Sequence, residues 1–378
     1  MKNGAITSNR PRMNNFVGRR IYADILGSKQ CQGIKKYQEY ETKILLRDLS
    51  LTPDKFFTHM ERTLSSVIFS AVYGVRISRL DHPIIVELFD LWASILQYVQ
   101  PGKLLVDWIP VLERLPISWQ PWARLADSYA ARESAISMAF LRTLRKQIAD
   151  GTEPTCFGVG ILKHQKKEGF GDDVTIGLLN GIILAGADTT TTMMQSFFKV
   201  IAMNPEAQQR AQEELDQVVG PSRLPTWEDE PNLPYVRAVI KELHRYCSLL
   251  TIGVWHVASE EFTYQGCRIP NETLIMPNVG TLHRDPERYD DADKFMPERY
   301  LGDDLSAYNS SKQPDYLKRD HINYGFGRRL CQDGFVRKPK PFKLDITPRS
   351  EMARQVVMKT AVEATTDLPD IESIEMTE

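Results

Sequence analysis

The segment "GIILAGADTTTTMM" (residues 181–194) lies in the middle of a long apolar stretch, which predicts one helix from Asp172 to about Met203. Its composition works against a helix, because glycine costs about 1 kcal/mol relative to alanine and threonine is β-branched. A mid-helix hydroxyl can donate to the carbonyl four residues earlier, which for Thr189 belongs to Ala185. We expect such bonds to loosen the helix and open a notch for a small ligand and a water.

Asp188 stands beside this notch, where a carboxylate could relay protons. The alternative is a surface helix whose threonines form an ordinary polar face. Outward from this helix the chain is mainly helical until about residue 247, after which short strands appear. The same apolar spacing predicts helices from Thr52 to Gly74, from Asn204-Pro205 to Gly220 and from Leu233 to about Cys247, then a hairpin around Gln265-Gly266 and a strand in "TLIMPNV".

The stretch Pro101–Trp122 is rich in proline and tryptophan, which predicts a long, apolar, non-helical connection. It is either a packed surface loop or a loop that lines a channel or dips into a membrane. We expect one domain over residues 1–360. Residues 361–378 are acidic without a basic residue, which predicts a disordered tail.

The composition restricts the class of protein. With 378 residues, 42% hydrophobic, 25% charged and a net charge of −2, the chain has the composition of a soluble globular protein and no general affinity for nucleic acid. Five widely spaced cysteines without a CxxC pair argue against a disulfide framework and a zinc ribbon. The N-terminus does not resemble a signal peptide, and the apolar run 176–187 is too short to span a bilayer, so no membrane anchor is expected.

Two further groups carry potential chemistry. In "KELHRY", Glu242 and Arg245 are spaced to meet on one face of a helix, and Arg299 follows in "DKFMPERY". An exposed ion pair of little energetic value is the plain interpretation. A buried cluster results if Arg299 adds a second guanidinium to the carboxylate.

The segment "INYGFGRRLCQDGF" (residues 322–335) surrounds Cys331 with two arginines and little side-chain bulk. Glycines at 325 and 327 allow the backbone to approach a flat macrocycle, and Arg328 or Arg329 can pair with its carboxylates. A single thiolate without a second ligand at metal-binding spacing suits the axial position of a haem iron better than zinc. A buried, inert cysteine is the alternative.

Together these residues resemble the cytochrome P-450 family of haem-thiolate monooxygenases. The family's cysteine loop, F-x-x-G-x-R-x-C-x-G, is similar to Tyr324, Gly327, Arg329 and Cys331, and its (A/G)-G-x-(D/E)-T-T helix motif is matched by Ala185, Gly186, Asp188, Thr189 and Thr190. The family's ExxR and P-E-R elements correspond to Glu242, Arg245 and Arg299. The segment around His256 resembles the strand in which a basic residue meets a haem propionate. The style of the residues around 278–301 is most similar to fungal members that tailor secondary metabolites.

The resemblance implies a mainly α cytochrome P-450 fold with a small β portion, and insertion of one oxygen atom from O2 into an apolar small molecule. It implies haem (iron protoporphyrin IX) with Cys331 as axial ligand, Asp188 and Thr189 as proton relay, and Arg329 and His256 as propionate partners. Glu242, Arg245 and Arg299 would support the cofactor site. It also implies a monomer that receives electrons from an NADPH-dependent flavoprotein reductase through the cysteine face, where Arg328, Lys338 and Lys340 offer positive charge. The expected location is the cytosolic face of the endoplasmic reticulum membrane, or the cytoplasm for a chain without an anchor.

Some residues depart from the family pattern. Asp333 occupies the position of a glycine, and the helix that follows the cysteine in the family is replaced at once by "VRKPKPFKLDITPRS". Segments near the N-terminus are also missing, so the fold is expected to be incomplete there and after the cysteine loop. The sequence therefore predicts a truncated or exon-skipped product. The alternative functions are a non-catalytic remnant that cannot hold haem and an interaction protein built on a helical scaffold.

Overall fold

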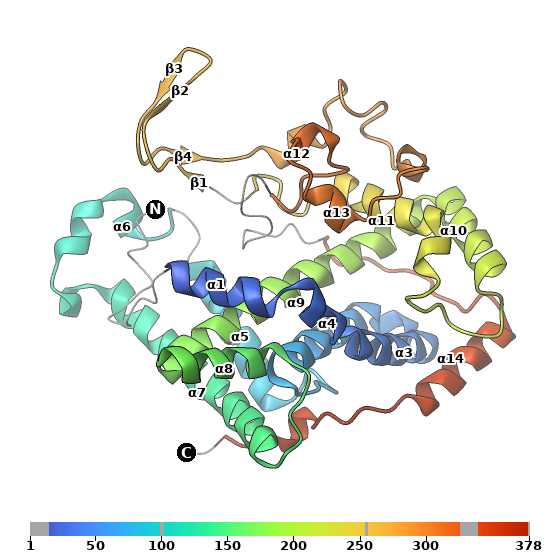
Figure 1. The fold of residues 1–378 in the computed structure, drawn as a ribbon, viewed down its shortest axis with the longest axis horizontal. Helices are drawn as coiled ribbons and strands as arrows, with labels where there is room; N and C mark the ends of the chain where they lie inside the picture. Colours follow the sequence, from blue (N-terminus) through green and yellow to red (C-terminus); the bar gives the residue numbers. More distant parts are fainter. Residues whose placement is uncertain (1–14, 99–101, 254–255, 326–338, 377–378) are drawn as a thin grey trace. The chain divides into compact units, whose positions relative to one another are not determined.

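A computed structural model describes residues 15–98, 102–253, 256–325 and 339–376, which fold mainly into helices (Figure 1). The helices are α1 (Asn15–Ile25), α2 (Ser28–Gln32), α3 (Lys35–Leu51), α4 (Phe56–Tyr73), α5 (Pro83–Tyr98), α6 (Leu105–Trp108), α7 (Pro121–Ala149), α8 (Phe157–Glu168), α9 (Asp172–Met203), α10 (Pro205–Val218), α11 (Pro234–Tyr246), α12 (Val279–Leu282), α13 (Ala307–Ser311) and α14 (Glu351–Glu363). The strands are β1 (His256–Val257), β2 (Phe262–Tyr264), β3 (Cys267–Ile269) and β4 (Leu274–Ile275). The mainly α fold with a small β portion is confirmed.

In the described part of the chain the strands form two small antiparallel sheets. β1 pairs with β4, with His256 opposite Ile275, and β2 pairs with β3, with Phe262 opposite Ile269. The hairpin turns at Gln265 (φ 47°) and Gly266 (φ 80°), as predicted, because a tight turn needs positive φ angles. Figure 1 shows this hairpin as a projecting arm of exposed residues.

The predicted ends of the main helices agree with the structure. α9 runs from Asp172 to Met203 without interruption, and Asn204-Pro205 separates it from α10. α4 ends before Gly74, whose φ of 66° reverses the chain while its amide donates to the Ser70 carbonyl at 3.1 Å. These boundaries follow from local chemistry, which is why sequence reasoning found them.

The chain divides into two compact units, whereas the sequence predicted one domain over residues 1–360 and a separate tail. Unit 1 comprises Met1–Thr42, Arg62–Leu184 and Ala364–Glu378, and unit 2 comprises Lys43–Glu61 and Ala185–Glu363. Three helices, α3, α4 and α9, continue from one unit into the other. The grouping depends on packing between distant segments, which a single sequence does not reveal.

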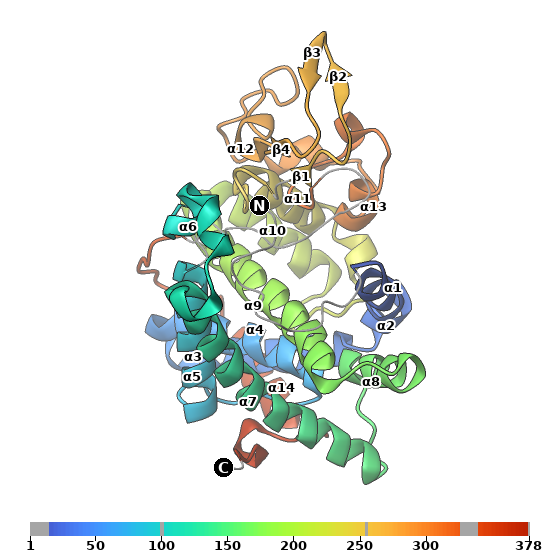
Figure 2. The same ribbon diagram turned by 90° about the vertical axis from the view of Figure 1, so that its left-hand side faces the viewer.

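The core of unit 1 is formed by α1, α4, α5, α7, α8 and the first part of α9. α5 packs alongside α7, and α1 against α8 (Figure 2). Gly160 permits the second contact, because a Cβ there would lie 2.9 Å from Cγ2 of Ile25. Asn180, which interrupts the apolar run of α9, is buried and hydrogen-bonded to the hydroxyls of Tyr73 and Ser137 at 3.2 and 3.1 Å. A polar residue in this core is therefore satisfied rather than exposed.

Among the described residues, α9 is the helix long and apolar enough to cross a membrane by length and composition. Within unit 1, however, Ile176, Leu179 and Ile183 of α9 are buried in the protein core. This core position accounts for the apolar character of the first part of the helix.

The core of unit 2 contains an aromatic cluster at the start of α4. Phe56 and Met60 are buried, and Phe56 packs against Phe198 of α9 and Phe342, with ring centroids 5.9 and 5.4 Å apart. Phe342 precedes α14, so this cluster fixes the chain that leads into that helix.

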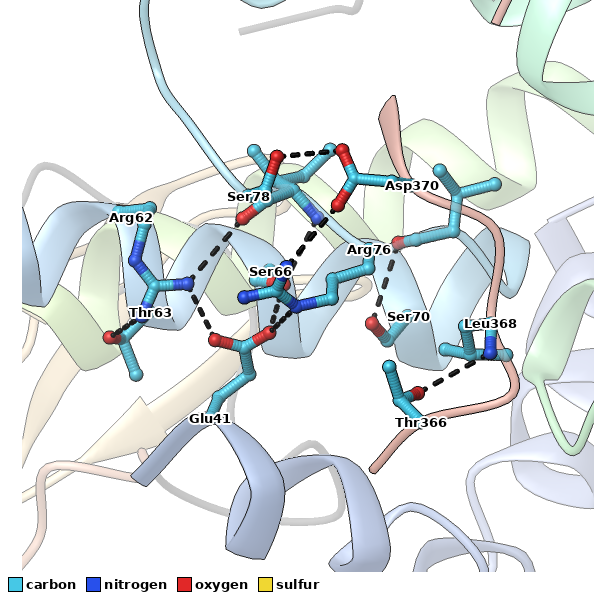
Figure 3. A network of polar contacts seen from close by, with 12 residues as sticks. Glu41, Arg62, Thr63, Ser66, Ser70, Arg76, Ser78, Thr366, Leu368 and Asp370 are labelled. Atoms are coloured by element: carbon cyan, nitrogen blue, oxygen red, sulfur yellow. Dashed lines mark hydrogen bonds and ion pairs between the residues drawn. The ribbon is translucent and has the colours of Figure 1, made fainter. Parts of the chain in front are cut away.

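The C-terminal tail corrects a prediction, because residues 364–376 are not disordered but belong to unit 1 (Figure 3). Ile371 and Ile374 are buried in its core, at 0% and 5% exposure. Asp370 pairs with Arg76 at 3.3 Å and accepts the Ser78 hydroxyl at 2.6 Å, and the backbones of residues 76 and 370 form a parallel bridge. The tail lacks cations of its own, so composition alone missed the partners that hold it.

The same network centres on Glu41, which is 1% exposed (Figure 3). Its carboxylate accepts from Arg62 at 2.5 Å, Arg76 at 2.8 Å and the Ser66 hydroxyl at 2.7 Å. A buried carboxylate needs such compensation, because removal from water costs several kcal/mol per ion. Through Arg76, which pairs with both Glu41 and Asp370, the tail is attached to a charge cluster formed by residues of α3 and α4.

The connection Pro101–Trp122 also differs from the prediction, because its described residues form short helical turns rather than a non-helical loop. These turns are α6 and two 3₁₀ helices, Pro110–Arg114 and Ile117–Trp119. Prolines stand at or next to the start of the last two and at the start of α7, where a missing N–H has no cost. Six large apolar side chains remain exposed here: Leu105, Trp108, Ile109, Val111, Ile117 and Trp119.

Candidate functional site

The middle of α9 carries the threonines that the sequence singled out. The Thr189 hydroxyl donates to the Ala185 carbonyl at 2.7 Å, which confirms the predicted bond. Thr191 and Thr192 make the same contact four residues back, each at 2.8 Å. The helix stays α-helical throughout. These hydroxyls are therefore fixed in direction, each with its hydrogen bound and its oxygen lone pairs left to accept.

Burial changes along this part of α9. Ile183 and Thr192 are fully buried, whereas Ala185, Gly186, Ala187, Asp188 and Thr189 are each partly accessible. Among the described residues, this stretch of small side chains is only partly covered, which leaves one side of it accessible. This is the property that a haem site requires of these residues, and they fit it.

A second element is the buried pair on α11. Glu242 and Arg245 are both 0% exposed, and the guanidinium binds the carboxylate through Nε to Oε2 at 2.7 Å and Nη2 to Oε1 at 2.6 Å. The remaining donors of Arg245 reach the carbonyls of His283, Ala292 and Lys294 at 2.7, 2.8 and 3.0 Å. All five N–H groups of the guanidinium are thereby used.

Arg299 completes this cluster from the 3₁₀ helix Pro297–Tyr300. Its Nε lies 3.4 Å from Oε1 of Glu242, and the Met296 amide donates to the same oxygen at 2.9 Å. Burial acts to lower the pKa of Arg245, but the hydrogen bonds and charge of Glu242 outweigh it and raise that pKa. The plain alternative, an exposed ion pair, is excluded by the burial.

The structure does not bring every candidate residue together. His256 lies on β1 and is half-buried, and within the described residues no hydrogen bond or ion pair joins it to Glu242, Arg245 or Arg299. Arg329 and Cys331 lie outside the described residues, as do Arg328 and Lys338. Their assignments remain predictions from the sequence.

Three histidines, which sequence reasoning missed, lie around the residues that lead to the cysteine stretch; His283 and His321 are buried and His244 is partly buried. His244 of α11 stacks on His321 with ring centroids 4.6 Å apart, and His283 lies edge-on to His321 at 6.5 Å. Tyr324 contacts both His321 and His244, at 4.9 and 5.6 Å. The three histidines are 39 and 38 residues apart, and no helix or strand period links such positions.

The histidines are held neutral. Burial lowers the pKa of His244 to about 4, and burial together with the charge of Arg245 lowers that of His283 to about 3. Burial and the neighbouring histidines lower the pKa of His321 well below its ordinary value. The unfolded chain takes up protons below about pH 6.5 while these folded histidines do not, so acidification through this range disfavours the folded state.

An open groove of about 500 Å³ lies in unit 2. Its walls are formed by one face of the end of α9, by the end of α11 with the residues after it, and by residues 339 and 340. The lining residues are Ser196, Lys199, Val200, Met203, Tyr246, Cys247, Ser248, Thr251, Arg284, Pro339 and Lys340. Three of them are cationic, although Arg284 also pairs with the exposed Asp293 at 3.3 Å.

Comparison with known proteins gives consistent matches. Residues 2–332 match the sequence model of the family described as Cytochrome P450. The cytochrome P450 monooxygenase polD of Polytolypa hystricis is 42% identical over 420 positions, which cover 97% of this chain and 81% of that protein. The cytochrome P450 monooxygenase virE of Hypocrea virens is 30% identical over 376 positions, which cover 88% of this chain and 68% of virE.

A third relative, the cytochrome P450 monooxygenase fogE of Aspergillus ruber, is 33% identical over 315 positions that cover 83% of this chain and 58% of fogE. The chain therefore spans between 58% and 81% of the length of these three proteins. Because the polD alignment has 420 positions and this chain has 378 residues, at least 42 positions face gaps in this chain.

Proposed function

The chain belongs to the cytochrome P450 family, and on that basis we propose that it inserts one oxygen atom from O2 into an apolar small molecule, in the biosynthesis of a fungal secondary metabolite. The observation that carries the proposal is the family match over residues 2–332, which includes Cys331. Named monooxygenases from three fungi are among its relatives. The partly accessible small residues of α9 and the satisfied Glu242 cluster support it.

The residues divide the work as follows. Cys331 would hold the iron of a bound haem, Arg329 and His256 would hold its propionates, and the haem would supply the activation of O2. Thr189 and Asp188 would hold and pass a proton at the accessible part of α9. Glu242, Arg245 and Arg299 make no contact with substrate in this proposal and instead fix the fold around the site.

The decisive experiment is the difference spectrum of the purified ferrous chain with carbon monoxide, followed by turnover with isotopically labelled O2. A red-shifted, thiolate-type band and one labelled oxygen atom in the product are expected. A product without label would refute oxygen insertion. The electron donor proposed is an NADPH-dependent flavoprotein reductase acting on a monomer, and Lys199, Arg284 and Lys340 of the groove offer positive charge for it.

A second candidate, a non-catalytic remnant, is favoured by one observation. At least 42 positions of polD face gaps in this chain, and Asp333 stands where the family has glycine. Titration of the purified chain with haemin separates the two candidates. Saturable uptake of one haem per chain supports the enzyme, and no uptake supports the remnant.

Replacement of Thr189 by alanine is expected to keep haem and substrate binding but to divert reducing equivalents to hydrogen peroxide. The reason is that the directed hydroxyl is lost, and a positioned proton-transfer group contributes about 10²–10⁴-fold to its step. Product formed per NADPH should fall by about tenfold or more. NADPH, peroxide and product are measured together, with a substrate found by screening apolar compounds.

The matched control is Thr191→Ala, which removes the same kind of backbone contact, to Ala187, without touching the family motif. It should leave the coupling near that of the unaltered chain. Equal loss of coupling in both variants would show that only the helix is affected and would contradict the proton-relay role.

We further propose that the chain works on the cytosolic face of the endoplasmic reticulum membrane. Support comes from the exposed apolar side chains between residues 105 and 119, where Trp108 and Trp119 are 74% and 70% exposed. Tryptophan favours the membrane–water interface, and contiguous exposed apolar surface marks a contact site.

The double variant Trp108→Ser/Trp119→Ser is expected to lower binding to phosphatidylcholine vesicles by about tenfold or more, since burial of one large apolar side chain contributes about 1.5–3 kcal/mol. Vesicle co-sedimentation measures the partition coefficient. Trp227→Ser, which alters a 42% exposed tryptophan of unit 2, is the control. Unchanged partitioning of the double variant would count against this membrane face.

A further inference from the structure

His283 connects the buried Glu242–Arg245 pair to the chain that leads into the cysteine stretch. It directly follows α12 and is 0% exposed. Its carbonyl accepts from Nη1 of Arg245 at 2.7 Å. Its ring makes two more contacts, with the Ser248 hydroxyl at 2.8 Å through Nδ1 and with the Ile322 amide at 2.9 Å through Nε2. One residue thus makes three contacts and joins two separate segments of unit 2, the end of α11 with the residues after it and the chain at Ile322.

The partners determine the tautomer of His283. A backbone amide can only donate, so Nε2 must be the unprotonated acceptor for Ile322. The proton therefore resides on Nδ1 and is donated to Ser248, whose hydroxyl in turn donates to the Arg245 carbonyl at 3.3 Å. Every polar group of the ring is satisfied in this one arrangement. A neutral ring is required, and the depressed pKa of His283 agrees with it.

The segment 320–325 is held at several points, but the other contacts act on different atoms. Tyr289 and Tyr300 donate to the Asp320 carbonyl at 3.1 and 2.8 Å. The Asn323 side chain donates to the His244 carbonyl. Ile322 itself is 1% exposed, so its amide has no access to water and depends on His283 for an acceptor.

We propose that His283 is a positioning residue that transmits the fixed geometry of the Glu242–Arg245 pair to the backbone of Ile322, nine residues before Cys331. Ile322 is thereby held at a fixed point in the chain that leads toward Cys331. This role rests on the proposed function, because it concerns the ligand of a haem. It requires an acceptor at Nε2 and not merely a side chain that fills the space.

The test compares His283→Gln with His283→Asn. A glutamine amide reaches the Nε2 position and can accept from Ile322, whereas the shorter asparagine reaches only the Nδ1 position and serves Ser248. Amide hydrogen exchange of the apo chain reports on Ile322 directly, without any cofactor. We expect exchange at Ile322 to be about 5- to 150-fold faster in the asparagine variant, the range for a buried donor left unsatisfied, and close to the unaltered chain in the glutamine variant.

Haemin dissociation is then measured for the same proteins, and it should be faster in the asparagine variant by a similar factor. Ser248→Ala, which removes only the Nδ1 partner, is the control and should preserve protection at Ile322. Equal protection in the two His283 variants, or equal haemin dissociation, would overturn the positioning role. If the unaltered chain takes up no haemin, the proposed function fails, and exchange at Ile322 still decides whether His283 holds that backbone.

Discussion

Replacement of Glu242 by alanine is expected to lower the free energy of unfolding by about 3–5 kcal/mol, the range for a buried ion pair that loses one partner. Arg245 would keep its three carbonyl acceptors but lose both bonds to the carboxylate, at 2.6 and 2.7 Å, in a fully buried site. Total stability of a folded protein is about 5–15 kcal/mol, so this single change could consume most of it. Urea unfolding followed by far-ultraviolet circular dichroism measures the change.

The control is Glu261→Ala, which removes a carboxylate 2.7 Å from the guanidinium of Arg268. These side chains are 49% and 74% exposed, and such pairs contribute about 0–1 kcal/mol. The two variants remove the same chemical group from the same type of partner and differ in burial. A similar small effect in both would mean that the Glu242 cluster is not a determinant of stability.

Replacement of Cys331 by alanine is expected to abolish the thiolate-type absorption band that the ferrous chain shows with carbon monoxide. The four described cysteines are poor substitutes. Burial raises the pKa of Cys156 and Cys247 to about 11 and also raises that of Cys31, so these remain thiols at neutral pH. Because the thiolate is the form that binds metal, none of the three is prepared as a ligand.

Cys267 lies exposed on the β2–β3 hairpin, and Cys267→Ser is the control that should keep the band. Haem content is determined separately, so that loss of the ligand is distinguished from loss of the haem. Persistence of the band in Cys331→Ala would show that another residue binds the iron and would overturn the assignment of Cys331.

Sequence reasoning succeeded where the chemistry is local. The ends of α9 and α11, the positive-φ turn at Gln265-Gly266 and the Thr189 contact all depend on residues within four or five positions of one another. The cluster of Glu242, Arg245 and Arg299 was one of two alternatives from the residues alone, and the family resemblance favoured it. Its carbonyl partners, from residues 283, 292 and 294, were not predicted.

The failures share a physical cause, since each involves partners distant in sequence. The composition of the acidic tail predicted that it could not bury apolar surface. In the structure, Ile371 and Ile374 pack into a core formed by segments about 200–350 residues earlier, and Asp370 pairs with Arg76. His283 carries no signal of its own, because its role comes from the amide of Ile322 and the hydroxyl of Ser248. Charge and periodicity are properties of one segment, so they cannot predict contacts that form between two distant segments.

The composition of unit 1 from both ends of the chain has a consequence for its synthesis on the ribosome. Residues to Leu184 emerge early, but the last piece, from Ala364, emerges 180 residues later. At about 5–20 residues per second, this delay lasts roughly 10–40 s. During that time the nascent chain exposes the apolar surface that Ile371 and Ile374 later cover, and Arg76 lacks its ion-pair partner Asp370. A premature stop codon near the end of the reading frame would therefore damage the part of the protein that was made first.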